Sequence, residues 1–108
     1  MINGFYAVQF KSPVGMGGGV IILEDGTIKG VDSTIYYYGS YQESDENFTA
    51  ELRIDTHLNL PGHTTVFGIP KADLKISGKI AAGKITGNAT SPQAPGINMG
   101  FVATKLNV

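Results

Sequence analysis

The chain has 108 residues, with 15 glycines, 5 prolines, no cysteine and a formal net charge of −1. Glycine is about twice as frequent as in an average protein, whereas charged residues make up only 16%. This balance excludes a charge-rich disordered chain and a basic surface for nucleic acid, and the lack of cysteine excludes disulfides and thiolate chemistry.

The length is that of one domain, spanning residues 1–108, which can bury its own core. The N-terminal residues do not have the basic and apolar segments of a signal peptide. The longest apolar run, from Val20 to Leu23, is too short to span a bilayer. We therefore expect a cytoplasmic protein that makes no membrane contact.

The first half of the chain alternates apolar and polar residues, which is typical of half-buried strands. Tyr6, Val8 and Phe10 form the inward face of the first strand. A loop is expected at 12–17, and Asp25-Gly26 is expected to form a type I′ hairpin turn. Further strands are predicted at 19–24, 27–32 and 34–43, followed by a polar loop at 44–47.

The longest alternating segment covers residues 48–58. Its apolar side chains share one face of a strand, whereas helical spacing would scatter them around an axis. These side chains are Phe48, Ala50, Leu52, Ile54 and Leu58. Beyond it the pattern predicts a short strand at 64–69, strands at 73–80, 84–89 and 99–106, and an irregular loop at 90–98.

About eight short strands joined in sequence predict a closed barrel or a sandwich. Closure is favoured because it removes exposed sheet edges from a chain with few edge-protecting charges. Glycines inside the strand patterns are typical of bends in a small barrel. The predicted fold is therefore all-β, an eight-stranded antiparallel up-and-down β-barrel.

No residue pattern indicates catalysis, a metal or a cofactor. The glycine run at 15–19 has the wrong spacing for a nucleotide-binding loop and leads into a strand instead of a helix. Asp55, His57 and His63 lack the spacing of a zinc site. The chain also has no serine nucleophile elbow. We therefore expect a protein that is not an enzyme.

Two apolar features predict a contact between copies of the chain. Val20 to Leu23 is apolar on both faces, so either Val20 and Ile22 or Ile21 and Leu23 need cover from a loop or a second copy. Tyr36, Tyr37 and Tyr38 cannot all face inward, and the outward ring either packs across strands or anchors an interface. The predicted homodimer interface consists of Val20, Ile21, Ile22, Leu23 and Tyr37.

Glu43, Asp45 and Glu46 form the densest cluster of charge in the sequence, at the expected tip of a hairpin. The cluster is either a solvated turn or a docking point that attracts a basic protein partner. These three residues are the predicted partner-binding site.

The barrel interior suggests a second function, the binding of a small apolar ligand. An eight-stranded barrel can enclose one small molecule, and several inward positions are glycine or alanine, so the barrel either flattens or holds a cavity. The predicted lining residues are Tyr6, Phe10, Leu52, Ile54 and Phe101.

Three stretches of sequence resemble the GrlR-like negative regulators of type III secretion genes. They are Asn-Gly-Phe-Tyr-Ala-Val-Gln-Phe at 3–10, the glycine-entered strand, turn and Gly-Val-Asp at 17–32, and Tyr-Gly-Ser-Tyr at 38–41 followed by the acidic tip. Val31 stands where the family has a second glycine. The resemblance implies a lipocalin-like (calycin-type) barrel that dimerises. It also implies repression by protein contact with a transcriptional activator, through an acidic loop at Glu43, Asp45 and Glu46, without DNA binding.

Overall fold

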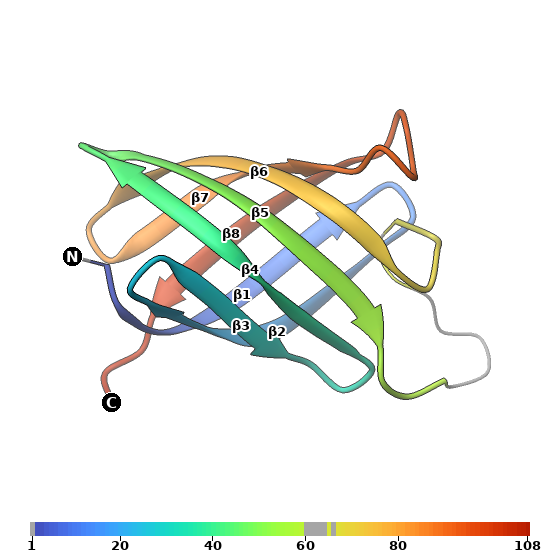
Figure 1. Ribbon diagram of the computed structural model, residues 1–108, viewed down its shortest axis with the longest axis horizontal. Helices are drawn as coiled ribbons and strands as arrows, with labels where there is room; N and C mark the ends of the chain where they lie inside the picture. Colours follow the sequence, from blue (N-terminus) through green and yellow to red (C-terminus); the bar gives the residue numbers. More distant parts are fainter. Residues whose placement is uncertain (1, 60–64, 66) are drawn as a thin grey trace.

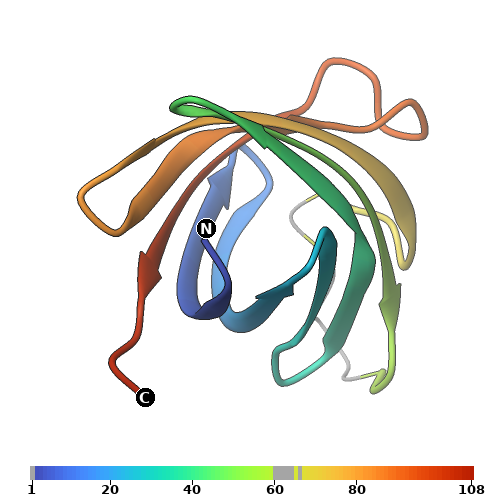
Figure 2. The same ribbon diagram turned by 60° about the vertical axis from the view of Figure 1, so that its left-hand side comes forward.

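The computed structural model describes residues 2–59, 65 and 67–108. Its eight antiparallel strands each pair with the next, and β8 pairs with β1, which closes the barrel (Figure 1). The strands are β1 (Gly4–Ser12), β2 (Gly15–Glu24), β3 (Thr27–Val31), β4 (Ile35–Ser44), β5 (Asn47–Thr56), β6 (Ala72–Ala81), β7 (Lys84–Thr90) and β8 (Asn98–Lys105). The predicted all-β, up-and-down barrel is confirmed, and Figure 2 shows the strands wrapped around an interior.

The alternation of side chains in β5 shows why the chain forms a barrel wall. Phe48, Ala50 and Ile54 are buried and Leu52 is half-buried, whereas the side chains that alternate with them are exposed: Thr49, Glu51 and Arg53. The prediction for Leu58 was wrong: β5 ends at Thr56, and Leu58 is 46% exposed. The buried face of β5 therefore ends at Ile54, before the position that the hydrophobic pattern indicated.

Two predicted boundaries differ from the structure in the first half of the chain. β2 begins at Gly15, so a two-residue turn joins it to β1 instead of the loop expected at 12–17. Glycine has no side chain that could show alternation, which hid the first half of β2. The Asp25-Gly26 turn has positive φ at both residues, as a type I′ turn requires.

The strand predicted at 64–69 is not present in the residues of that segment that the structure describes. Thr64 and Val66 lie outside the described residues, and residues 67–70 form turns and bends. The Thr65 hydroxyl donates to the Ile69 carbonyl at 2.6 Å and accepts from the Phe67 amide at 3.2 Å. These local bonds compete with strand pairing, and the resulting turn buries Phe67, which is 2% exposed.

The interior contains two hydrophobic clusters that occupy opposite ends of the barrel. Four partly buried side chains contact both clusters and connect them: Ile21, Leu52, Ile76 and Phe101. The first cluster includes Tyr37 and Phe67, and the second includes Tyr6 and Tyr41. No helix in the described part of the chain is long and apolar enough to cross a membrane.

The N-terminal residues close the end of the barrel that holds the second cluster. Tyr6 donates to the carbonyl of Ile2 at 2.8 Å, and Tyr41 donates to Asn3 Oδ1 at 2.9 Å. The Asn3 amide in turn donates to Asp25 in the β2–β3 turn at 3.1 Å. The hydrogen bonds of the N-terminal residues thus join β1, β4 and the β2–β3 turn across this end.

Candidate ligand-binding cavity

The barrel encloses a cavity of about 320 Å³ to which all eight strands contribute side chains. This volume lies at the small end of the range for ligand sites, which is about 300–1,000 Å³. Its apolar lining residues are Val8, Phe10, Met16, Ile21, Ile28, Ile35, Tyr37, Phe48, Leu52, Ile54, Phe67, Leu74, Ile76, Ile85, Met99, Phe101 and Ala103. The lining includes residues of both hydrophobic clusters, so the cavity extends between them.

Four of the five residues predicted to line a cavity do so: Phe10, Leu52, Ile54 and Phe101. Tyr6 does not. It is 2% exposed and belongs to the closed end, where its hydroxyl bonds the carbonyl of Ile2. The sequence pattern identified which face of β1 points inward, but not how far along the barrel the free space extends.

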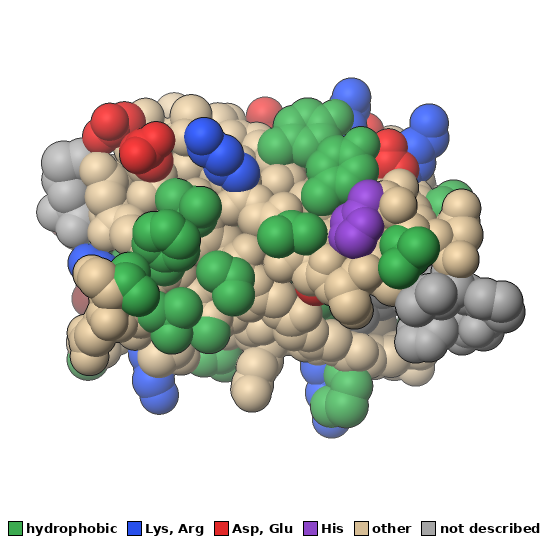
Figure 3. All heavy atoms as spheres, turned by 90° about the horizontal axis from the view of Figure 1, so that it is seen from below, with side chains coloured by type: hydrophobic (Ala, Val, Ile, Leu, Met, Phe, Trp, Pro, Cys, Tyr) green, Lys and Arg blue, Asp and Glu red, His purple; other side chains and the backbone are tan. Residues whose placement is uncertain are grey.

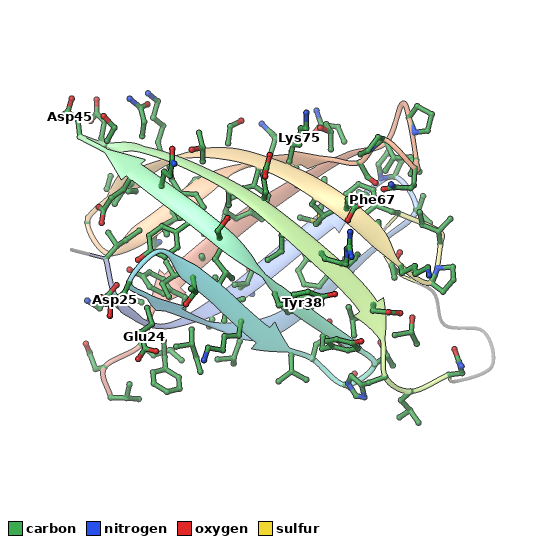
Figure 4. The ribbon with its side chains drawn as sticks, viewed as in Figure 1. Glu24, Asp25, Tyr38, Asp45, Phe67 and Lys75 are labelled. Atoms are coloured by element: carbon green, nitrogen blue, oxygen red, sulfur yellow. The ribbon has the colours of Figure 1, made fainter. Side chains whose placement is uncertain are left out.

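The cavity reaches the surface at the turn between β3 and β4, which we call the mouth. Ser33 and Met16 line the cavity and are exposed, and Met16 is 75% exposed. Phe67 lies at this end of the barrel, far from Asp45 at the other end (Figure 4). A ligand could therefore enter beside the β3–β4 turn.

Asp32 is the single charged residue among the described residues that line the cavity. Its Oδ1 accepts hydrogen bonds from the amides of Thr34 at 2.9 Å and Ile35 at 2.7 Å, which hold the β3–β4 turn. Its Oδ2 accepts a hydrogen bond from the Tyr37 hydroxyl. The carboxylate is thus fixed at the mouth by three uncharged donors.

Two glycines make room for the Tyr37 ring that reaches Asp32. A Cβ atom at Gly19 would lie 2.7 Å from the Tyr37 hydroxyl oxygen, and one at Gly30 would lie 2.8 Å from the ring. Burial, the hydrogen bond to Asp32 and the charge of Asp32 raise the pKa of Tyr37 far above its ordinary value. The phenol therefore remains a hydrogen-bond donor at the mouth.

Sequence reasoning did not identify the pairing of Asp32 with Tyr37 and assigned Tyr37 to a dimer interface. The structure corrects that assignment, because Tyr37 is 7% exposed and lies inside the barrel. The sequence signal was Gly30, a glycine inside a predicted strand. In the structure it pairs with Tyr37 across β3 and β4. A glycine opposite an inward tyrosine leaves space for the ring to lie over the neighbouring strand.

The structure also shows which side chains of the apolar run at 20–23 in β2 face inward and which face outward. Ile21 lines the cavity and Leu23 is 1% exposed, so both face inward and cannot contribute to an outer contact. Val20 and Ile22 face outward, where they pair with Ala7 and Phe5 of β1. Of the residues predicted for a dimer interface on this strand, only Val20 and Ile22 face outward, and their part in a dimer stays a prediction.

Val20 and Ile22 belong to a row of outward apolar side chains that crosses four strands. We call this row the outer apolar surface, and it consists of Phe5, Ala7, Val20, Ile22, Val31, Tyr36 and Tyr38. Tyr36 and Tyr38 stack with ring centroids 6.0 Å apart. Figure 3 shows hydrophobic side chains gathered over this side of the barrel.

The three acidic residues lie together at the β4–β5 hairpin. Glu43, Asp45 and Glu46 are all exposed, and Asp45 adopts a positive φ of 56° in the turn. None of them forms an ion pair with another described residue. Asp45 points away from the barrel at its far end (Figure 4), so the charge is presented to solvent.

The histidines do not assemble a metal site within the described part of the chain. His57 Nε2 lies 2.9 Å from the main-chain oxygen of Asp32, and its ring lies beside Tyr36. His63 lies outside the described residues. Among the described residues, no group of three or more His, Cys, Asp or Glu could hold an ion.

No protein-family model matches the chain, and no curated protein matches it in sequence. The fold is that of an eight-stranded antiparallel closed β-barrel. The features of the molecule that bear on its function are the cavity, the outer apolar surface and the acidic β4–β5 hairpin.

Proposed function

We propose that this protein binds a small, mainly apolar ligand inside its barrel. The observation that carries the proposal is the cavity of about 320 Å³, whose lining is apolar except at the mouth. Protein interiors are normally packed to the density of organic crystals, with few voids larger than a water molecule. A cavity of this size, with an opening, is typical of a binding site.

The architecture is suited to this function. A closed eight-stranded barrel has an interior that side chains can just fill or that can hold one small ligand. Here small residues in the lining, such as Gly17, Gly18 and Ala103, leave part of the interior free. An apolar ligand would restore the dispersion contacts that the lining residues lose beside empty space.

Filling the cavity tests the proposal. Leu52 contacts both hydrophobic clusters and lines the cavity, so Leu52→Trp places an indole in the space that a ligand would take. We expect the wild type to bind one equivalent of an apolar fluorescent dye. The variant should bind it at least about tenfold more weakly, a loss of about 1.4 kcal/mol.

Thr49→Trp is the matched control, because Thr49 is exposed on the same strand. It adds the same ring outside the barrel and should bind dye as the wild type does. Equal binding by a folded Leu52→Trp variant would place the dye outside the cavity and contradict the proposal.

A second candidate is regulation by protein contact, and two surface features favour it. The acidic tip at Glu43, Asp45 and Glu46 is exposed and unpaired with described cations, and the outer apolar surface offers cover for a second copy. Together with the resemblance to GrlR-like proteins, they support a cytoplasmic, dimeric, lipocalin-like regulator that contacts a transcriptional activator. This role uses the outside of the barrel and is compatible with a ligand inside it.

A further inference from the structure

We infer that the ligand of this cavity is a small organic cation, an ammonium group attached to an apolar tail. The inference rests on the proposed ligand-binding function and names the chemistry of the same site. Its basis is the composition of the lining, which combines one carboxylate, five aromatic rings and no cationic side chain among the described residues.

The charge of Asp32 has no counterion in the described part of the cavity. All three of its hydrogen-bond donors, two amides and the Tyr37 hydroxyl, are neutral. His57 contacts the main-chain oxygen of Asp32 and not its carboxylate. An anion beside an apolar, low-dielectric space attracts a cation more strongly than it would in water.

The aromatic lining favours the same class of ligand. Phe10, Tyr37, Phe48, Phe67 and Phe101 all line the cavity. The faces of such rings attract cations, and groups of aromatic side chains bind organic ammonium ions in other proteins. Phe10 packs edge-to-face on Tyr37, with centroids 6.4 Å apart, so rings and carboxylate meet close to the mouth.

The same lining disfavours a fatty acid. A carboxylate headgroup at the mouth would meet the charge of Asp32 and would find no lysine, arginine or histidine among the described lining residues. Like charges at short range disfavour the charged form of each other. The cavity thus selects for the sign of the headgroup as well as for the apolar tail.

The volume sets the size of the tail. The cavity of about 320 Å³ lies at the small end of the range for ligand sites, about 300–1,000 Å³, which favours a short tail. An eight-carbon chain with one headgroup is therefore a suitable probe. Octylammonium, octanol and nonanoate have the same octyl tail and carry a positive, a neutral and a negative headgroup respectively.

Titration calorimetry of the full chain with these three probes is the test. Octanol carries no charge, so its affinity measures binding to the apolar cavity without a charge interaction with Asp32. We expect octylammonium to bind at least about tenfold more tightly than octanol, and nonanoate to bind more weakly than octanol. Asp32→Asn should bring the affinities for octylammonium and octanol to within about twofold of each other, because it removes the charge while the asparagine carbonyl can still accept from the amides of Thr34 and Ile35.

Asp55→Asn is the matched control. It changes the net charge by the same amount on the outside of the barrel, and it should keep the preference for ammonium. If octanol binds and octylammonium binds no better, or if the preference survives in Asp32→Asn, the inference is overturned while the ligand-binding function stands. If no probe binds, both the inference and the proposed ligand-binding function are contradicted. Should Asp32→Asn fail to fold, the order of the three probes on the wild type decides.

Discussion

The contact between Asp32 and Tyr37 shows how individual residues shape this cavity. Tyr37 can cross the inner face of β2 and β3 only because Gly19 and Gly30 lack side chains. Its hydroxyl then satisfies one oxygen of the carboxylate that also holds the β3–β4 turn. The two residues therefore contribute to stability as well as to the mouth of the cavity.

This pair predicts a specific loss of stability at alkaline pH. An unfolded tyrosine ionises near pH 10.0, and the pKa of folded Tyr37 is higher, chiefly because the ring is buried. A raised pKa contributes stability that is fully present below about pH 10 and is lost as the pH rises beyond it. Tyr37→Phe removes the group that ionises together with its hydrogen bond.

We expect Tyr37→Phe to be about 1 kcal/mol less stable than the wild type at neutral pH. The difference should shrink as the pH rises above about 10. Urea unfolding over a pH series measures it. The pKa values of Tyr6 and Tyr36 are also raised, but both residues remain in the variant, so their effects cancel. A difference that stays constant with pH would show that ionisation of Tyr37 does not affect folding.

At the scale of elements, the strands with full side-chain alternation were predictable from the sequence, whereas the first half of β2 was not. β5 alternates through Phe48, Ala50 and Ile54, so its inward face is explicit in the sequence. The glycines from Gly15 to Gly19 carry no such signal, and their pairing with β1 appears only in three dimensions. The cavity was equally hidden, because its volume depends on how side chains from all eight strands meet.

The β4–β5 hairpin gives the prediction that belongs to this scale. Combining Glu43→Gln, Asp45→Asn and Glu46→Gln removes the three charges of the acidic tip. Asparagine is chosen at position 45 because it tolerates the positive φ found there. Because the residues are exposed, the free energy of unfolding should change by no more than about 0.5 kcal/mol. Capture of a partner protein from cell extract by the variant should be lost.

A control with Glu24→Gln, Glu51→Gln and Asp55→Asn removes the same number of charges away from the tip and should retain the partner. Capture of the same protein by the tip variant would show that the hairpin does not dock it. Loss in both variants would attribute binding to net charge and not to the hairpin.

At the scale of the whole molecule, the barrel has an apolar interior and an apolar stretch of outer wall. The outer apolar surface crosses β1 to β4, and Val31 and Phe5 within it are 52% and 42% exposed. The barrel is closed, so this surface cannot be covered by adding a strand to a sheet edge. A second copy that packs its own outer apolar surface against it would remove both from water.

Two neighbouring substitutions separate this contact from the core. Ile22→Glu places a charge on the outer apolar surface, opposite Phe5 and Lys29, and should give a folded monomer. Ile21→Glu places the charge in the cavity wall, where Ile21 connects both hydrophobic clusters. An unpaired buried charge costs about 3–5 kcal/mol, enough to unfold much of a domain of marginal stability. Sedimentation equilibrium and circular dichroism measure the two effects, and a wild-type monomer, or a dimer that survives Ile22→Glu, would exclude this face as the interface.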